Sequence, residues 1–256
     1  LAPDVVLANV PYVTLLAAQR AGIPAAGFCS LNWYDILAGY CADRTDARPM
    51  LDAIASAYRA ATVFLCPTPS LPMPWHPRVQ TVGPVARTPA PVARPAALPA
   101  HADGGPAIVL LSLGGIRSDL GLAAVPRVEG VHWIVAIDQI DARRDDVTRL
   151  DELGVGLLDV LPFADAVVAK TGYGTFVEAA CNGVRVLYAE RPDWPEAPAL
   201  ESWLSEHATA AAISQDALYD GTYADALMAL LARPRSQVVA ATGAQEVAHT
   251  LTELAR

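Results

Sequence analysis

Short apolar runs and helical patterns alternate at the start of the chain. Apolar runs at residues 4–8, 24–28 and 62–66 predict strands, whereas residues 12–21 and 50–61 show helical spacing. Strands that alternate with helices in this way are typical of a parallel sheet covered on both faces. We therefore expect a Rossmann-like domain over residues 1–85.

Prolines recur throughout residues 67–106, where they exclude helix interiors and central strands. The part up to Val85 is predicted to be an ordered connection. Residues 86–105 are predicted to form an exposed and semi-rigid interdomain linker, because proline favours extended geometry.

A second α/β series follows the linker and predicts a second Rossmann-like domain over residues 106–256, closed by helices. Its predicted strands are 107–113, 131–137, 155–158, 166–169, 184–188 and 208–213. Its predicted helices are 175–182, 197–207, 222–232 and 236–254.

Composition narrows the class of protein. The chain is 53% apolar with a mean hydropathy of +0.30, yet no apolar run reaches the roughly 18–20 residues of a membrane span. The net charge of −9 argues against broad binding to nucleic acid or anionic membranes. We expect a soluble protein without a membrane span, and the sequence leaves its oligomeric state open.

Cysteine and histidine patterns indicate neither disulfides nor a metal. The cysteines are widely spaced and form no C-x-x-C pair, which favours free thiols in a reducing, cytoplasmic compartment. The histidines form no metal-binding motif, so no metal and no resident cofactor are expected. The cysteines are Cys29, Cys41, Cys66 and Cys181.

The segment after the predicted strand 166–169 carries the strongest local signal. It reads Lys170-Thr171-Gly172-Tyr173-Gly174-Thr175, and Lys170 is the chain's only lysine among 18 basic residues. Glycines let a backbone approach a ligand closely, and the following helix start offers N–H groups and partial positive charge. This is suitable for a diphosphate, although a G-x-G turn of this kind also occurs without any ligand.

Further candidates stand at the ends of other strands. Glu178 lies one helical turn beyond Thr175 and can accept hydrogen bonds from ribose hydroxyls, or it is an ordinary helix glutamate. The turn at Ser112, Gly114 and Gly115 ends the first strand of the second series, on the edge where open α/β sheets bind ligands. After the fifth strand, a loop carries Arg191, which could meet a phosphate, and Asp193 and Glu196, either of which could accept sugar hydroxyls. An ordinary charged loop is the other interpretation of each of these residues.

The first domain contributes polar and aromatic residues after its second predicted strand. Asn32 and Trp33 suit an acceptor, with packing as the other interpretation of Trp33, and Asp35 is a candidate catalytic base.

Several segments, in order over residues 3–207, resemble a known family. Residues 169–180 (AKTGYGTFVEAA) and 191–198 (RPDWPEAP) resemble the glycosyltransferase-like N-terminal half of plant arabinokinase, as do residues 32–36 and 66–74. More distantly, the spacing of Gly172, Thr175 and Glu178 is similar to the donor motif of the GT-B enzyme that adds N-acetylglucosamine to the peptidoglycan precursor.

The resemblance implies a GT-B-like α/β fold with two Rossmann-like domains facing a cleft, in which residues 1–85 form the acceptor side and residues 106–256 bind the donor. The chain enters at Pro3 in what reads as the middle of a domain, so we expect on the order of 100 residues of the N-terminal half to be absent from it. It implies that Glu178 holds the ribose, and that Gly172, Gly174 and Thr175 face the diphosphate opposite the Ser112 turn. The sequence departs from the pattern because no Gln-Gln or Asp-Gln pair follows the fifth strand. The kinase half of arabinokinase is also absent, so its phosphotransfer activity is not carried over.

These observations lead to three hypotheses of function. The first is metal-independent transfer of a sugar from a nucleoside-diphosphate donor to an unknown acceptor. The second is a binding module that senses a nucleotide sugar without turning it over. The third is a nucleotide-sugar epimerase or hydrolase on the same architecture.

Overall fold

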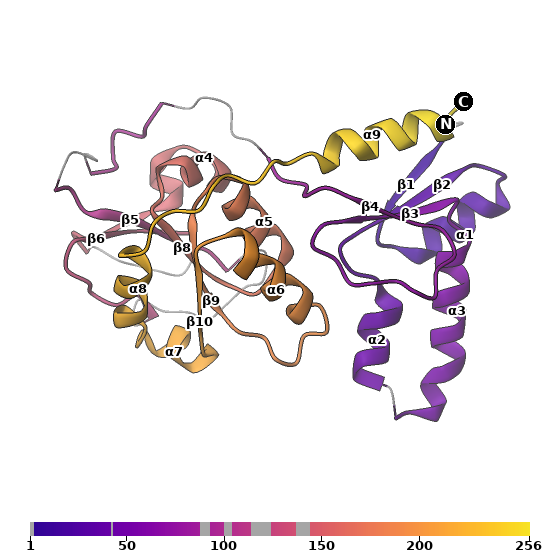
Figure 1. Cartoon of the computed structure of the whole chain (residues 1–256), viewed down its shortest axis with the longest axis horizontal. Helices are drawn as coiled ribbons and strands as arrows, with labels where there is room; N and C mark the ends of the chain where they lie inside the picture. Colours follow the sequence, from indigo (N-terminus) through magenta and orange to yellow (C-terminus); the bar gives the residue numbers. More distant parts are fainter. Residues whose placement is uncertain (1–2, 42, 88–92, 100–103, 114–123, 137–143) are drawn as a thin grey trace. The chain divides into compact units, whose positions relative to one another are not determined.

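The structure is a computed structural model that describes residues 3–41, 43–87, 93–99, 104–113, 124–136 and 144–256. The chain forms two compact α/β units (Figure 1). Unit 1 consists of Leu1–Val85, Asp193–Leu200 and Ala240–Arg256, and unit 2 of Ala86–Pro192 and Glu201–Val239. The first division lies between Val85 and Ala86, and residues 193–200 and the last helix group with unit 1.

Unit 1 contains a parallel sheet of four strands in the order β1-β2-β3-β4. The three predicted strands are confirmed, and a fourth follows within the stretch that was expected to be a connection. This fourth strand is short, mostly exposed and flanked by prolines, which are tolerated beside an edge strand. The strands are β1 Val6–Asn9, β2 Ala25–Phe28, β3 Val63–Pro67 and β4 Val79–Val82.

One face of this sheet packs on helices α1 (Tyr12–Arg20) and α3 (Arg48–Arg59), through a core that includes Leu15, Tyr58 and Phe64. A short 3-10 helix, η1 (Thr45–Ala47), precedes α3.

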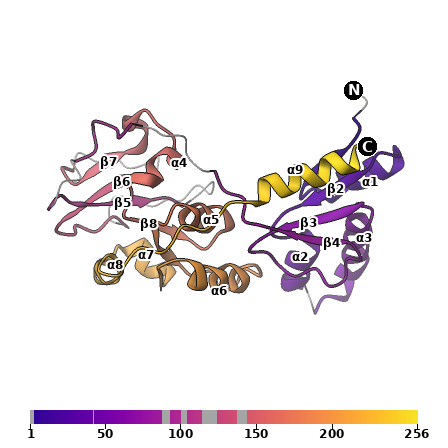
Figure 2. The same cartoon turned by 45° about the horizontal axis from the view of Figure 1, so that its top comes forward.

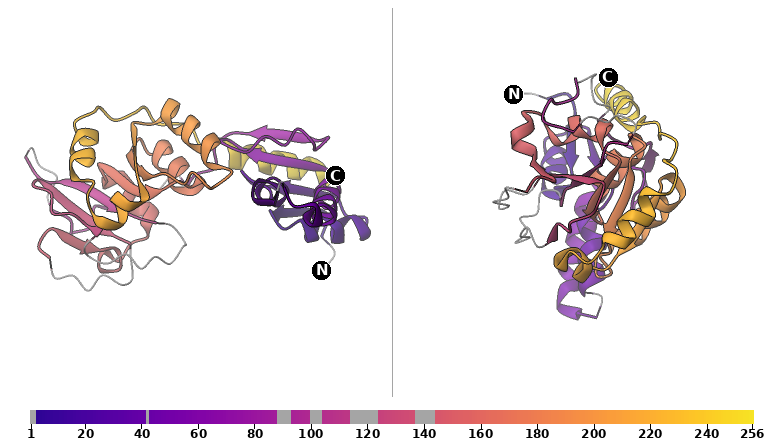
Figure 3. Two further views of the ribbon diagram at one scale, coloured as in Figure 1. Left: turned by 90° about the horizontal axis from the view of Figure 1, so that it is seen from below. Right: turned by 90° about the vertical axis from the view of Figure 1, so that its left-hand side faces the viewer.

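The opposite face of the sheet is covered by the last helix, α9 (Gly243–Leu254), which lies against the strands of unit 1 in Figures 2 and 3. Val247 packs with Ala26, Leu65 and Val82 in a second core, because successive residues of a strand point to opposite faces. The helix begins at Gly243, not at Ser236 as predicted.

A close backbone contact fixes the start of α9. The N–H of Gly243 donates to the carbonyl oxygen of Pro84 at 3.0 Å, and the N–H of Gly83 donates to Glu246 Oε2 at 3.0 Å. A Cβ atom on Gly243 would overlap the carbonyl oxygen of Gly83. Glycine is therefore required here by the approach of the two backbones.

Unit 2 contains a parallel sheet of six strands in the order β10-β9-β8-β5-β6-β7. Its core includes Val109, Trp133, Val168 and Leu187, which lie on four neighbouring strands. The strands are β5 Ala107–Leu111, β6 Val131–Val135, β7 Val147–Arg149, β8 Ala166–Lys170, β9 Arg185–Ala189 and β10 Ala210–Ile213.

The predicted strand at residues 155–158 is wrong. The strand that pairs with β6 is β7, and the leucine-rich segment forms helix α4 (Leu157–Val160) and the 3-10 helix η4 (Leu161–Phe163). Gly154 has a left-handed backbone that ends the preceding 3-10 helix, η3 (Leu150–Leu153), and reverses the chain.

Four longer helices complete unit 2 or connect to it. Helix α7 was not predicted, and α6 begins within residues grouped with unit 1 and ends in unit 2. The helices are α5 Tyr173–Cys181, α6 Ala197–His207, α7 Gln215–Asp220 and α8 Ala224–Leu231. Within the described part of the chain, no helix is both long enough and apolar enough to cross a membrane.

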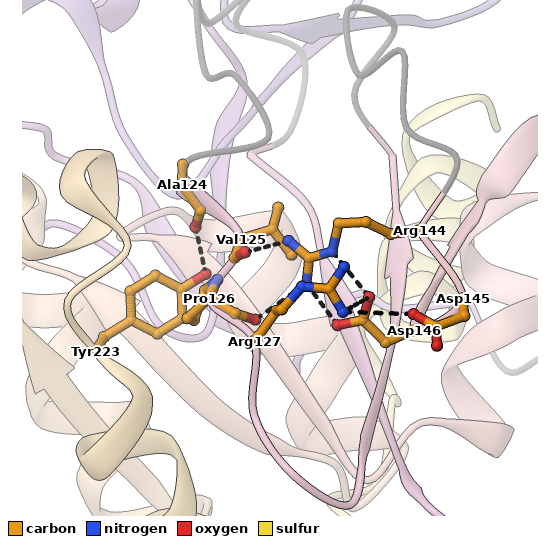
Figure 4. Close-up of polar contacts among 8 residues, drawn as sticks. All are labelled: Ala124, Val125, Pro126, Arg127, Arg144, Asp145, Asp146 and Tyr223. Carbon is orange, nitrogen blue, oxygen red and sulfur yellow. Dashed lines mark hydrogen bonds and ion pairs between the residues drawn. The ribbon is translucent and has the colours of Figure 1, made fainter.

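Arg144 ties together the segments that enter β6 and β7 (Figure 4). Its guanidinium donates to the carbonyl oxygen of Val125 at 2.6 Å and forms a bidentate pair with Asp146, which lowers the pKa of that carboxyl. The hydroxyl of Tyr223 donates to the carbonyl oxygen of Ala124 at 2.8 Å. These bonds fix the edge of the sheet opposite to the carboxyl ends of the strands.

The Gly83–Gly243 contact gives a stability prediction. Alanine at the exposed first turn of a helix normally stabilises relative to glycine by up to about 1 kcal/mol. Gly243→Ala should instead lower the free energy of unfolding by about 1–3 kcal/mol, because the new methyl group must displace the backbone of Gly83. Urea denaturation measures the change, with the exposed substitution Gln245→Ala on the same helix as a control expected to stay within about 0.5 kcal/mol. A stabilised Gly243→Ala variant would contradict the contact.

Candidate functional site

The strand order of unit 2 reverses between β5 and β8. The chain runs from β5 outward to β6 and β7, and then returns to place β8, β9 and β10 on the other side of β5. Leu111 pairs with Val168, and the N–H of Ser112 donates to the carbonyl oxygen of Val168 at 3.0 Å. Open α/β sheets bind ligands at such a reversal, beyond the carboxyl ends of the two strands.

Two predicted turns meet at this edge. Ser112 follows β5 and is buried, while β8 ends at Lys170 beside it in the sheet. The expectation that both turns lie at the same edge is therefore confirmed for Ser112. Gly114 and Gly115 lie outside the described residues.

The start of α5 is open in front of Gly174. The helix begins at Tyr173, two residues earlier than predicted, and the N–H of Phe176 donates to the carbonyl oxygen of Gly172 at 3.2 Å. Gly174 is exposed, and a Cβ atom on it would meet nothing within 4 Å. The N–H groups of a first helical turn have no partner within their own helix and carry partial positive charge, so this opening suits an anion.

Thr171 braces the loop from inside. Its side chain is fully buried, and its hydroxyl lies 3.0 Å from the carbonyl oxygen of Ala189 and 2.9 Å from Glu201 Oε1. Its N–H also donates to the carbonyl oxygen of Ala189 at 3.0 Å. These bonds fix the turn between β8 and α5 to the end of β9.

Two cationic residues stand at the carboxyl ends of neighbouring strands, because β8 ends at Lys170, which pairs with Ala189 at the end of β9, and Arg191 follows β9 closely. Burial lowers the pKa of Lys170, and the charge of Arg191 lowers it further. Arg191 donates from Nη1 to the carbonyl oxygen of Thr171 at 3.4 Å. Like charges held together beside the positive end of a helix favour a bound anion.

A cavity of about 290 Å³ opens beside this loop. Its wall is mainly leucine and valine side chains from β5, β8, α4 and η4, and its few polar groups come from Ser112, Thr175 and Glu178. An apolar cavity with a few convergent polar groups is the usual form of a small-molecule site. The lining residues are Leu110, Ser112, Leu157, Leu158, Leu161, Val167, Gly174, Thr175 and Glu178.

The leucine wall of this cavity was not predicted from the sequence. Residues 155–158 were predicted to form a strand, in which Leu157 and Leu158 would face opposite sides of the sheet. Leu157, Leu158 and Leu161 follow helical spacing, which is the signal that identifies them as one surface.

Glu178 is half-buried at the rim of the cavity. The N–H of Arg87 donates to both of its carboxylate oxygens, at 2.9 Å and 3.1 Å. Burial raises the pKa of Glu178, while the hydrogen bond and positive charge of Arg87 oppose the rise. Neither Arg87 nor Asp159, to which its guanidinium bonds, was a predicted site residue.

Asn32, Trp33 and Asp35 lie at the start of α2 (Trp33–Cys41) in unit 1, a helix that was not predicted. Asn32 caps the helix, because its Oδ1 accepts from the N–H of Asp35 at 2.8 Å. The carboxylate of Asp35 accepts from Asn32 Nδ2 at 2.6 Å and from Trp75 Nε1 at 3.1 Å. Trp33 is 42% exposed and is available to a ligand of unit 1.

Asp193 and Glu196 also group with unit 1. Asp193 is exposed, whereas Glu196 is buried, with its Oε2 accepting from Trp194 Nε1 at 3.2 Å. Among the described residues, Glu196 Oε1 has no hydrogen-bond partner. Burial, and to a lesser extent the charge of Glu196, raises the pKa of the Cys29 thiol.

The described part of the chain contains no group of three or more His, Cys, Asp or Glu residues arranged to hold a metal ion.

Comparisons with known proteins place this geometry in a wider context. No family model and no curated protein sequence matches the chain. The solved structure of the glycotransferase of kitacinnamycin matches with a TM-score of 0.60 and 20% identity, over 99% of this chain and 71% of that one.

Two further structures match to a similar degree. The glycosyltransferase VinC in complex with DTDP has a TM-score of 0.60 and 20% identity, over 99% of this chain and 68% of its own. MurG of Acinetobacter baumannii has a TM-score of 0.57 and 18% identity, over 98% and 74% respectively. The chain therefore has the mixed α/β GT-B fold with two parallel sheets, as predicted.

The bracing role of Thr171 is testable through its bond to Glu201. Thr171→Val keeps the shape of the side chain but removes the hydroxyl, so the free energy of unfolding should fall by about 1–3 kcal/mol. A double-mutant cycle with Glu201→Ala, read by urea denaturation, should show a smaller loss once Glu201 is absent. Equal losses of unfolding free energy with and without Glu201 would show that the hydrogen bond between Thr171 and Glu201 contributes nothing.

Proposed function

We propose that the chain binds a nucleoside-diphosphate sugar at the strand-order reversal of unit 2 and transfers the sugar to an acceptor. The observation that carries the proposal is the cavity of about 290 Å³ beside the open start of α5, with an apolar wall and Glu178 at its rim. A nucleotide consists of a flat base, a ribose diol and an anionic tail, in that order. These three parts match the apolar wall, the carboxylate of Glu178 and the start of α5.

Each part of the nucleotide has a matching surface. The leucine wall from α4 and η4 would take the base, and the carboxylate of Glu178 would accept hydrogen bonds from the ribose hydroxyls. The diphosphate would lie at the first turn of α5, near Gly174 and Lys170, where helix N–H groups and a full positive charge converge.

The same groups would support transfer. When the sugar leaves, negative charge develops on the departing diphosphate, and donors already aimed at that position stabilise it without rearranging. A metal ion is not needed for this step if Lys170, Arg191 and the helix start supply the positive charge. Asp193 and Glu196 would accept hydroxyls of the sugar, and Asn32, Trp33 and Asp35 would serve the acceptor.

The finer assignment within the GT-B fold rests on the residues themselves. Residues 169–180 and 191–198 support a place near the glycosyltransferase-like half of arabinokinase. A cytoplasmic site of action is supported by the free thiols of all four cysteines.

A nucleotide-sugar sensor is a second candidate. The observation that favours it is the carboxylate of Asp35, which takes hydrogen bonds from both Asn32 and Trp75 and is therefore already engaged in the structure of unit 1. A sensor would bind the donor as tightly as a transferase but would yield no product.

Calorimetry with UDP-, GDP- and TDP-sugars tests the binding, and chromatography of reactions with varied acceptors tests the transfer. The proposal predicts that at least one donor binds. Binding with release of free nucleotide in the presence of an acceptor supports the transferase, and binding without turnover supports the sensor. Failure of every nucleotide sugar to bind the folded protein would reject both.

Two substitutions address the binding site directly. Lys170→Ala and Glu178→Ala should each weaken donor binding by about 1–3 kcal/mol, because each removes one charged partner. Arg20→Ala and Glu206→Ala, at exposed positions on α1 and α6, make the same changes of charge and should leave affinity unchanged. Unchanged affinity in both Lys170→Ala and Glu178→Ala would show that the donor does not bind at this loop.

The perturbed pKa values predict a narrowed pH range for donor binding. The raised pKa of Glu178 means that its carboxylate is protonated at a higher pH than an ordinary glutamate, so affinity should begin to fall earlier on acidification. The lowered pKa of Lys170 means that its charge is lost earlier as the pH rises. Calorimetry across pH should give a bell-shaped profile. Glu178→Gln should flatten its acid limb, and Lys170→Arg should extend its alkaline limb.

A further inference from the structure

Arg87 connects two walls of the nucleotide cavity. It lies in the segment predicted to be an exposed linker, yet its N–H donates to both carboxylate oxygens of Glu178 on α5, at 2.9 Å and 3.1 Å. Its guanidinium Nη2 donates to Asp159 Oδ1 on α4 at 2.9 Å. Both helices carry residues that line the cavity.

The bond to Glu178 fixes the orientation of its carboxylate. One N–H shared between two oxygens holds the plane of the group, and it leaves each oxygen with acceptor capacity for another donor. Two hydroxyls of a diol require such a pair of oxygens in a defined plane. The bond from Arg87 therefore prepares Glu178 for a ribose and does not consume it.

Asp159 holds the other end of this connection. Its Oδ2 accepts from the N–H of Gly156 at 3.2 Å, which attaches the carboxylate to the start of α4. The side chain of Arg87 is 54% exposed, so its ion pair with Asp159 contributes little by itself. The backbone N–H of Arg87 is the stronger element, because hydrogen bonds to charged groups exceed those between neutral groups.

The charged and titratable groups around Glu178 also indicate that Arg87 keeps its carboxylate ionised. Its burial favours the protonated form, and the groups that face it are Arg87 from the linker, Asp159 beyond that arginine, and the thiol of Cys181 on its own helix. Burial raises the pKa of Cys181 to about 11, and the charge of Glu178 contributes to this rise. Of these groups, Arg87 is the one that stabilises the ionised carboxylate.

We propose that Arg87 is a positioning residue for the nucleotide site, which holds the Glu178 carboxylate ionised and correctly oriented for the ribose. This inference rests on the proposed binding of a nucleotide at Glu178. It assigns to the linker a direct part in setting the affinity and the pH range of donor binding.

Three variants separate the two contributions of Arg87. Arg87→Ala removes the guanidinium but keeps the N–H, Arg87→Lys keeps a positive charge, and Arg87→Pro removes both the N–H and the guanidinium. The affinity for UDP, GDP and dTDP would be measured by calorimetry between pH 5 and pH 9, in the full chain. Arg20→Ala, at an exposed position in unit 1, is the control for loss of one arginine.

We expect Arg87→Pro to weaken binding about tenfold or more at neutral pH, because a hydrogen bond to a charged group is lost. Arg87→Ala should lose less affinity, and its acid limb should move to higher pH because the positive charge near Glu178 is gone. Arg87→Lys should return the acid limb of the pH profile to its wild-type position, because it keeps a positive charge near Glu178. In a Glu178→Gln background, Arg87→Ala should not shift the pH profile, since the titrating carboxylate is absent.

The possible outcomes are distinct. If the wild-type chain binds no nucleotide, the proposed function fails. If the wild type binds but the Arg87 variants keep its affinity and pH profile, the inference about Arg87 fails while the proposed function stands. Tighter binding by Arg87→Ala or Arg87→Pro would also overturn it, because Arg87 would then compete with the ribose. If Arg87→Pro does not fold, Arg87→Ala in the wild-type and Glu178→Gln backgrounds decides the question.

Discussion

The pairing of β5 with β8 is the constraint on which the site depends. Because β8 returns to the side of β5 opposite to β6, the connections after β5 and β8 diverge, and the carboxyl ends of these two strands lie next to each other. Ser112 and Lys170 become neighbours in this way although they are far apart in sequence. The apolar wall, the start of α5 and Glu178 are then arranged around this one crevice.

Burial and charge oppose each other at the crevice. Burial strengthens electrostatic contacts with a ligand, but it also disfavours the ionised forms of Glu178, at the rim of the cavity, and of Lys170, at the end of β8. It therefore raises the pKa of Glu178 and lowers the pKa of Lys170. At Glu178, the N–H and charge of Arg87 stabilise the carboxylate and oppose the rise of its pKa. At Lys170, the like charge of Arg191 adds to the effect of burial and lowers the pKa further.

Much of this arrangement follows from local sequence. The buried strands β5, β6, β8 and β9 were predicted because an apolar run followed by a glycine turn or a helix pattern specifies them without distant partners. Strand β4 was not predicted, because it depends on pairing with β3. The start of α9 was predicted wrongly, because residues 236–239 belong to unit 2, where the N–H of Val239 donates to the carbonyl oxygen of Ala180. Helix α2 was missed because its N-cap, Asn32, was interpreted only as a ligand-binding residue. The role of Arg87 could not be predicted either, since it arises from a backbone N–H that every non-proline residue carries.

The asymmetry between the two sides of the crevice explains what an anion would contribute to the protein itself. Two cations beside the positive end of a helix repel each other and the helix dipole, and this repulsion acts in the folded chain but is weak in the unfolded chain. If a diphosphate binds at the carboxyl ends of these strands as proposed, it would reduce that repulsion, and part of its binding energy would come from this reduction. Ligand binding to the folded state alone stabilises it by mass action. Under the proposed function, the stability of unit 2 would therefore increase when a diphosphate is bound beside Lys170 and Arg191.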